Sequence, residues 1–96
     1  MTTRIQLKHP QGKNAVSMDR VKYDSLKKAL LHHLMKEGDS SQGEICQTVT
    51  KDFKKNKTKF EGSIPWHLEW VKLDLEAKGS IARVPKTSPQ KYALTK

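Results

Sequence analysis

The chain has little of several features that define common protein classes. It contains one cysteine, Cys46, so it can form neither an intramolecular disulfide nor a cysteine-based zinc site. No window approaches the roughly 18 unbroken apolar residues of a membrane span, and the first residues are polar, without the apolar core of a signal peptide. We therefore expect a soluble cytoplasmic protein with no membrane partner. The length of 96 residues allows one small domain over 1–96.

Motifs for catalysis and metal binding are also missing. The sequence holds no glycine-rich phosphate loop and no Gly-x-Ser-x-Gly elbow. His32 and His33 are neighbours on a predicted helix, where their side chains point about 100° apart and cannot share one metal ion. Cys46 lies on an apolar helix face, which is typical of a small buried hydrophobe. We expect no enzyme activity, no catalytic residue, no metal and no cofactor.

Positive charge is what the chain has in excess. Lys and Arg number 19 against 10 Asp and Glu, which gives a net charge of +9 and favours a polyanionic partner. The excess is concentrated in the segment 51–59, with five lysines and one aspartate, and in 80–96, with four bases and no acid. Most of these bases are lysines, which are mobile point charges, whereas arginine has the planar fork suited to guanine edges. This composition favours contact with a nucleic-acid backbone.

Apolar periodicity predicts a first helix over about 18–37. The apolar residues between 23 and 34 recur every three or four positions and form one wide stripe. Ser17 is expected to cap the start of this helix, with Asp19 in its first turn. Gly38 supplies the positive backbone φ that ends a helix.

A second helix is predicted over about 42–56. Ser41 and Glu44 have the spacing of a capping box, in which each side chain satisfies a backbone amide of the other residue. The lysine-rich end of this helix suits its negative pole. Its apolar residues recur every fourth position and are assigned to the core: Ile45, Val49 and Phe53.

The remaining elements complete an α+β winged helix-turn-helix. A third helix starts near 62–63, where Pro65 is tolerated in the first turn, and ends at Gly79. Two alternating stretches, 80–84 and 91–95, follow as a β-hairpin wing with a proline-stiffened tip. A short strand is expected at 5–7, ahead of the helices. In this fold the third helix usually enters the major groove and the wing lies along the phosphates.

The third predicted helix is apolar on two opposite faces. One face is the core face, with Ile64, Leu68, Val71 and Leu75, and the other holds Trp66, Trp70, Leu73 and Ala77. The helix also carries three carboxylates after its first turn, which phosphates repel, so only the first turn suits DNA contact. Three interpretations of the second face stay open. The tryptophans pack under the N-terminal strand and stem 9–16, they form a homodimer or partner surface, or they stack on nucleotides.

Several stretches of the chain resemble known families. The segments 60–67, 71–79, 81–85 and 92–95, together with His9-Pro10-Gln11-Gly12-Lys13, look like a small family of bacterial winged-helix proteins described only as a domain of unknown function. The half from 70 to 95 is also similar to the N-terminal winged-helix domain of Mrr-type restriction endonucleases. That resemblance implies a DNA-targeting module. The nuclease domain has no counterpart in these residues, so no catalytic residue is implied.

Taken together, these features predict a winged-helix protein that binds DNA without sequence preference. The alternative for its basic residues is a solvated surface that only confers solubility, and Arg83 is as well suited to pairing with Glu76 as to phosphate contact. The alternative function is an interaction or homodimerisation module that uses Trp66, Trp70 and Leu73. The predicted nucleic-acid contacts lie after the second helix, in the first turn of the third helix and in the wing: Lys54, Lys55, Lys57, Lys59, Ser63, His67, Lys86 and Lys91.

Overall fold

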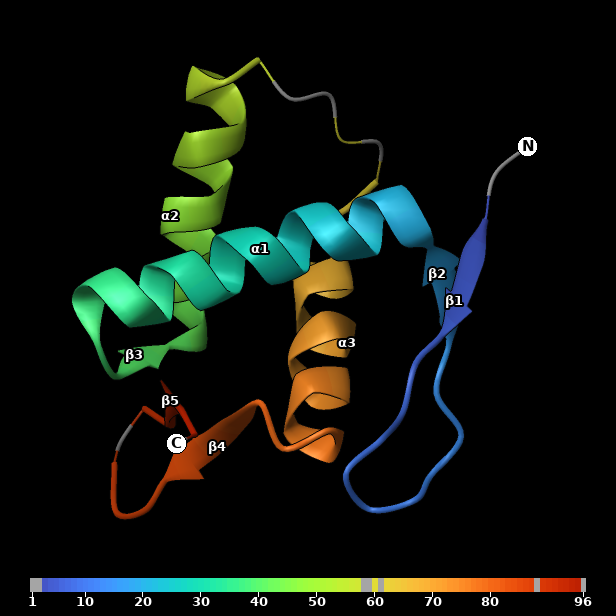
Figure 1. The fold of residues 1–96 in the computed structure, drawn as a ribbon. Coiled ribbons are helices and arrows are strands. Elements are labelled where there is room, and N and C mark those ends of the chain that lie inside the picture. The colour runs from blue at the N-terminus through green and yellow to red at the C-terminus, as the bar shows by residue number, and fades with distance from the viewer. Residues whose placement is uncertain (1–2, 58–59, 61, 88, 96) are drawn as a thin grey trace.

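The structure is a computed structural model that describes residues 3–57, 60, 62–87 and 89–95. Helix α1 crosses the middle of the molecule, α2 and α3 run transverse to it, and the strands lie at the periphery (Figure 1). The predicted α+β class is confirmed, and the arrangement is consistent with a winged helix. None of the helices in the described ranges has both the length and the apolar character for crossing a membrane. In chain order the elements are β1 (Arg4–Gln6), β2 (Ser17–Asp19), α1 (Arg20–Glu37), β3 (Ser40–Ser41), α2 (Gln42–Lys55), α3 (Ile64–Ala77), β4 (Ile81–Val84) and β5 (Lys91–Leu94).

The N-terminal segment forms a hairpin instead of a lone strand. Strands β1 and β2 pair antiparallel, with Ile5 opposite Met18. The prediction that Ser17 caps the first helix is wrong, because this residue belongs to β2 and its hydroxyl accepts a hydrogen bond from Arg4 Nε at 3.2 Å. Helix α1 starts at Arg20, and Asp19 at the N-cap position makes no side-chain cap bond.

The predicted starts of the other two helices are confirmed. At α2, Glu44 N donates to Ser41 Oγ (3.3 Å) while Ser41 N donates to Glu44 Oε1 (3.1 Å), which completes the capping box. At α3, Ser63 Oγ accepts a hydrogen bond from Trp66 N at 3.2 Å. Gly38 ends α1 with φ of 80°, a backbone conformation that residues with a Cβ rarely adopt.

The C-terminal strands form the predicted hairpin within a three-stranded sheet. Strands β4 and β5 pair antiparallel, with Ile81 opposite Leu94. The third strand, β3, lies between α1 and α2 and was not predicted, because two serines carry no alternating apolar pattern. It pairs antiparallel with β5, with Ser40 opposite Tyr92, so the order is β3-β5-β4. This pairing joins the turn between α1 and α2 to the wing.

The hydrophobic core lies where the three helices meet. The predicted core face of α3 is confirmed at Leu68, Val71 and Leu75, which are completely buried, whereas Ile64 at the start of the helix is partly buried. Cys46 is partly buried and packs against this core. The buried apolar residues are Leu7, Met18, Tyr23, Leu26, Leu30, Leu34, Ile45, Val49, Phe53, Leu68, Val71, Leu75, Ile81 and Tyr92.

Helix α3 is enclosed along most of its length. From His67 to Ala77 every residue is partly or fully buried, including the charged Lys72. The ammonium group of Lys72 pairs with Glu69 Oε2 at 2.8 Å and lies 4.4 Å from the ring centre of Tyr92. These contacts compensate the cost of burying a charge. Helix α3 is therefore a central packing element of this fold.

A buried carboxylate ties α3 to two other segments. Asp74 is completely buried, and its carboxylate accepts hydrogen bonds from the backbone amide of Lys8 (2.8 Å) and from the Tyr23 hydroxyl. Lys78 Nζ lies 2.9 Å from the same carboxylate. Burial and the hydrogen bond to Asp74 raise the pKa of Tyr23. Burial lowers the pKa of Lys78, but its bonds to Asp74 and Tyr23 outweigh this and raise it.

Candidate nucleic-acid interface

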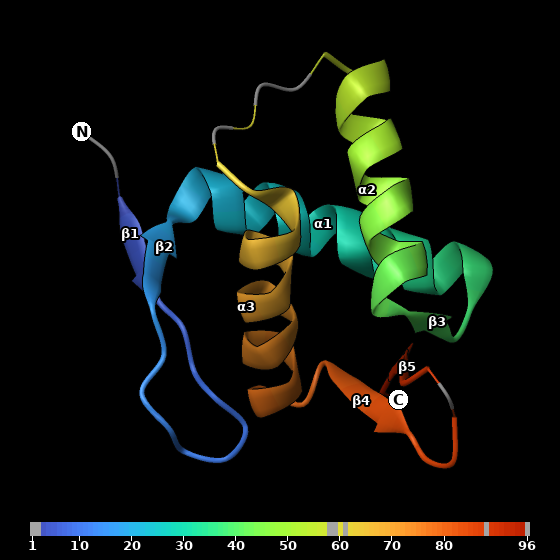
Figure 2. The same cartoon turned by 180° about the vertical axis from the view of Figure 1, so that it is seen from behind.

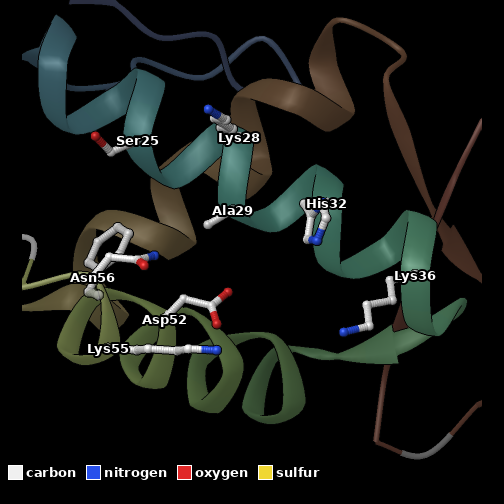
Figure 3. A pocket seen from close by; sticks show the side chains of 9 residues that line it. Ser25, Lys28, Ala29, His32, Lys36, Asp52, Lys55 and Asn56 are labelled. Carbon is white, nitrogen blue, oxygen red and sulfur yellow. The ribbon is translucent and has the colours of Figure 1, made fainter.

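An open groove of about 540 Å³ lies between α1 and α2. Figure 3 shows the side chains that line this groove. Its floor is partly apolar, and its rims carry lysine, histidine and polar side chains. The lining residues are Ser25, Lys28, Ala29, His32 and Lys36 from α1 and Asp52, Phe53, Lys55 and Asn56 from α2.

Helical spacing explains why these residues meet. Lys28, His32 and Lys36 follow one another at intervals of four on α1, so they share one face of that helix beside the core stripe. All three are exposed. None of the three was among the predicted nucleic-acid contacts, because the first helix was predicted from its apolar stripe and assigned to the core. Their spacing at intervals of four could have indicated a polar helix face, although not that α2 lies beside it.

The charge of the groove is positive, with one opposing group. Lys28, Lys36 and Lys55 contribute three ammonium groups, and Asp52 contributes one carboxylate. In Figure 3, Lys36 reaches from α1 toward α2, while Asp52 reaches from α2 toward α1. Lysine ammonium groups at the edges of an open groove are suited to phosphate oxygens. Because the groove is open, these contacts suit an extended polyanion.

The predicted lysine cluster lies at the end of α2 that borders this groove. Lys54 and Lys55 form the last turn of the helix and Lys57 follows it, and all three are exposed. Lys55 also lines the groove. Lys59 lies outside the described residues. The lysine-rich end of α2 therefore adjoins the basic face of α1 at Lys55.

The two predicted contacts in the first turn of α3 have structural partners. Ser63 is exposed, but its hydroxyl accepts the cap hydrogen bond of this helix. His67 Nδ1 donates to the Ser63 carbonyl oxygen at 2.7 Å. The imidazole ring of His67 also packs edge-on against Phe60, with ring centres 5.0 Å apart, and against Trp66 at 4.9 Å. His67 is therefore held in an aromatic cluster.

The wing lies away from the lysine-rich end of α2. Figures 1 and 2 place the end of α2 and the β4–β5 hairpin at opposite ends of the molecule, so the two basic clusters do not form one surface. Lys86 is exposed at the hairpin tip, whereas Lys91 is partly buried.

Hydrogen bonds from Ser41 lower the pKa of Glu44, and the charge of Lys91 contributes to the same shift. Of the two roles left open for Arg83, the pairing with Glu76 is present, at 3.1 Å.

The second apolar face of α3 is only partly accessible. Trp66 has 49% of its surface exposed, whereas Trp70 packs against the hydrophobic core and Leu73 is partly buried. The two indole rings contact each other at a centroid distance of 6.4 Å. The interpretation that both tryptophans are buried is wrong for Trp66. The predicted partner surface is thus reduced to one exposed ring.

Comparison with known proteins shows the family to which the chain belongs. The model of a family described only as "Family of unknown function (DUF6958)" matches residues 4–92. No curated protein and no solved structure matches the chain. Within the part of the chain that the structure describes, no three His, Cys, Asp or Glu side chains come together as a metal site requires. The family match agrees with the predicted likeness to an uncharacterised family, while the likeness to Mrr-type domains stays a prediction.

Proposed function

We propose that this chain, which belongs to the family of unknown function DUF6958, is a non-enzymatic protein that binds nucleic acid through backbone phosphates. One observation carries the proposal: lysines from α1 and α2 line a single groove beside the lysine-rich end of α2. The net charge of +9 adds long-range attraction for polyanions. Phosphate neutralisation by lysine supplies most of the affinity of non-specific nucleic-acid binding.

The enclosed position of α3 argues against sequence reading. A recognition helix must present side chains to base edges in the major groove. In α3 only Pro65 and Trp66 are exposed, and the helix carries the carboxylates of Glu69, Asp74 and Glu76. The proposed contact is therefore with the backbone, and it belongs to α1 and α2.

The wing has no part in the proposed site. Lys86 lies in the turn between β4 and β5, and Figures 1 and 2 place this hairpin at the opposite end of the molecule from the lysine-rich end of α2. Exposed charges farther apart than about 10 Å are largely screened at moderate salt. Reversing the charge of Lys86 therefore tests the effect of net charge on DNA binding, separately from the groove. Lys13, an exposed lysine in the loop between β1 and β2, serves the same purpose.

The test is a comparison of two double variants with equal net charge. Lys28→Glu with Lys55→Glu reverses two charges in the groove, and Lys13→Glu with Lys86→Glu reverses two charges outside it. Affinity for labelled DNA of mixed sequence, both duplex and single-stranded, is measured by fluorescence anisotropy at several salt concentrations. We expect the groove variant to lose about tenfold or more in affinity and to show a shallower salt dependence, because fewer counterions are released on binding.

The DNA affinity of the control variant should stay within a few-fold of the affinity of the unmodified protein. The proposal is overturned if the unmodified protein binds no DNA of either kind at low ionic strength. It is equally overturned if both double variants lose the same affinity, since the effect then follows net charge and not the groove. Circular dichroism of all variants confirms that the helices are intact.

A further inference from the structure

A row of aromatic rings leads from the groove to the one exposed tryptophan. Phe53 lines the groove, and its ring centre lies 5.7 Å from that of Phe60. Phe60 contacts His67 at 5.0 Å, and His67 contacts Trp66 at 4.9 Å. A series of ring contacts therefore links Trp66, at the start of α3, to Phe53 in the groove.

The basic face of α1 extends toward the same aromatic row. Lys22 precedes Ser25 and Lys28 on this helix, and its ammonium group lies 5.4 Å from the ring centre of Phe60. At 1.5 Å per residue, the helix from Lys22 to Lys36 provides a track of about 21 Å. Ammonium groups and aromatic rings therefore occur along one path that ends near Trp66.

Trp66 is both accessible and held in place. Nearly half of its surface is exposed, while its ring contacts His67 and Trp70 edge-on. A fixed, exposed ring next to a basic groove is the combination by which proteins bind single strands, because bases stack on the ring while cations follow the phosphates. In a duplex the bases are already stacked on one another and do not reach such a ring.

From these contacts we infer that the ligand of this groove is a single-stranded nucleic acid and that Trp66 stacks on one of its bases. The inference rests on the proposed function and names its substrate class. The enclosed α3 and the distant wing support it, because neither is placed to grip a duplex together with the α2 lysines. Stacking tolerates any base, so the absence of sequence preference is retained.

The test compares three labelled probes with the same number of phosphates: an oligothymidylate, an abasic strand and a blunt duplex. Affinities are measured for the unmodified protein, Trp66→Ala and Trp66→Phe. We expect Trp66→Ala to weaken oligothymidylate binding by about 5- to 100-fold, which corresponds to the loss of one stacked base. Trp66→Phe retains a ring and should recover most of that affinity. Abasic and duplex binding should not change in either variant.

Tryptophan fluorescence gives a second, independent readout, since the chain has only two tryptophans. In Trp70→Phe the emission comes from Trp66, and oligothymidylate should quench it strongly. In Trp66→Phe the emission comes from Trp70, which packs against the core, and quenching should be weak. The abasic strand should quench neither variant.

Three outcomes overturn this inference and separate it from the proposed function. If the duplex binds as tightly as the oligothymidylate, the single-strand preference is wrong but phosphate binding stands. If Trp66→Ala weakens all three probes equally, or lowers the molecular mass in solution because the ring joins two copies of the chain, Trp66 does not stack on bases. If the unmodified protein binds none of the probes, the proposed function itself fails.

Discussion

The hydroxyl group of Tyr23 on α1 donates a hydrogen bond to the carboxylate of Asp74 on α3, and this carboxylate is completely buried. The same carboxylate accepts a hydrogen bond from the backbone amide of Lys8 and forms an ion pair with Lys78. It therefore connects the N-terminal hairpin, α1 and α3 at one point. Each of these donors replaces part of the hydration that the carboxylate loses on burial.

Replacing Asp74 should destabilise the protein strongly. Asp74→Ala removes the acceptor and leaves the Tyr23 hydroxyl and the Lys8 amide without their partner. We expect a loss of about 3 kcal/mol in the free energy of unfolding, the magnitude typical of breaking a buried charged network. Urea denaturation measures this loss, with Asp24→Ala on the exposed surface of α1 as the control. A loss of less than about 1 kcal/mol would show that the network contributes little.

The same network predicts a loss of stability at alkaline pH. The pKa values of Tyr23 and Lys78 are both raised in the folded protein. The unfolded chain therefore releases these protons first, so stability is fully present below the ordinary values near pH 10 and falls as pH rises through the folded values. Melting temperatures measured from about pH 8 to 11 should decline, and Tyr23→Phe should decline less. Equal declines in the two proteins would contradict a contribution from Tyr23.

The two serine caps should differ in their contribution to stability. Ser41 takes part in two reciprocal hydrogen bonds, whereas Ser63 accepts one bond at an exposed helix start. We expect Ser41→Ala to cost about 1–2 kcal/mol and Ser63→Ala about 0.5–1 kcal/mol, measured by urea denaturation. Ser41→Thr keeps a hydroxyl and should recover part of the loss. A larger effect at Ser63 than at Ser41 would contradict this ranking.

The carboxylate of Asp52 should weaken the binding of polyanions to the groove. It lies among Lys28, Lys36 and Lys55 and repels the phosphates that these lysines attract. We expect Asp52→Asn to increase DNA affinity by about 2- to 5-fold at low salt. Asp39→Asn makes the same change of net charge in the exposed turn after α1 and should have a smaller effect. Anisotropy titrations distinguish the two variants, and equal gains would indicate that only net charge matters.

Local signals predicted the helices and the wing well. The capping box at Ser41 and Glu44, the glycine that ends α1 and the alternating strands of the wing each depend on residues close in sequence. Strands β2 and β3 escaped prediction because such short segments carry no alternating apolar pattern, and only their pairing with β1 and β5 makes them strands. Ser17 illustrates the reason: its hydroxyl is a good helix cap, yet pairing with β1 and a bond from Arg4 determine its position.

Only part of the candidate site could be predicted from the sequence. The lysines near the end of α2 form a run, so a segment count finds them. Lys28, His32 and Lys36 are spread along α1 among acidic and apolar residues, and they become a surface only where α2 packs across that helix. Their role depends on which helix faces which, and no local pattern contains that information.

The sequence by itself determined the excess of lysine, the single cysteine, the lack of a long apolar run, and the serine-capped starts of α2 and α3, because these depend on composition and short-range hydrogen bonds. Only the tertiary structure decided how the charged groups are combined. It enclosed α3 and buried Asp74 beneath Tyr23 and Lys78. It also placed the wing away from the α2 lysines and left Trp66 exposed. These relationships arise from packing between residues distant in the chain, where burial of apolar area and pairing of buried polar groups outweigh local preference.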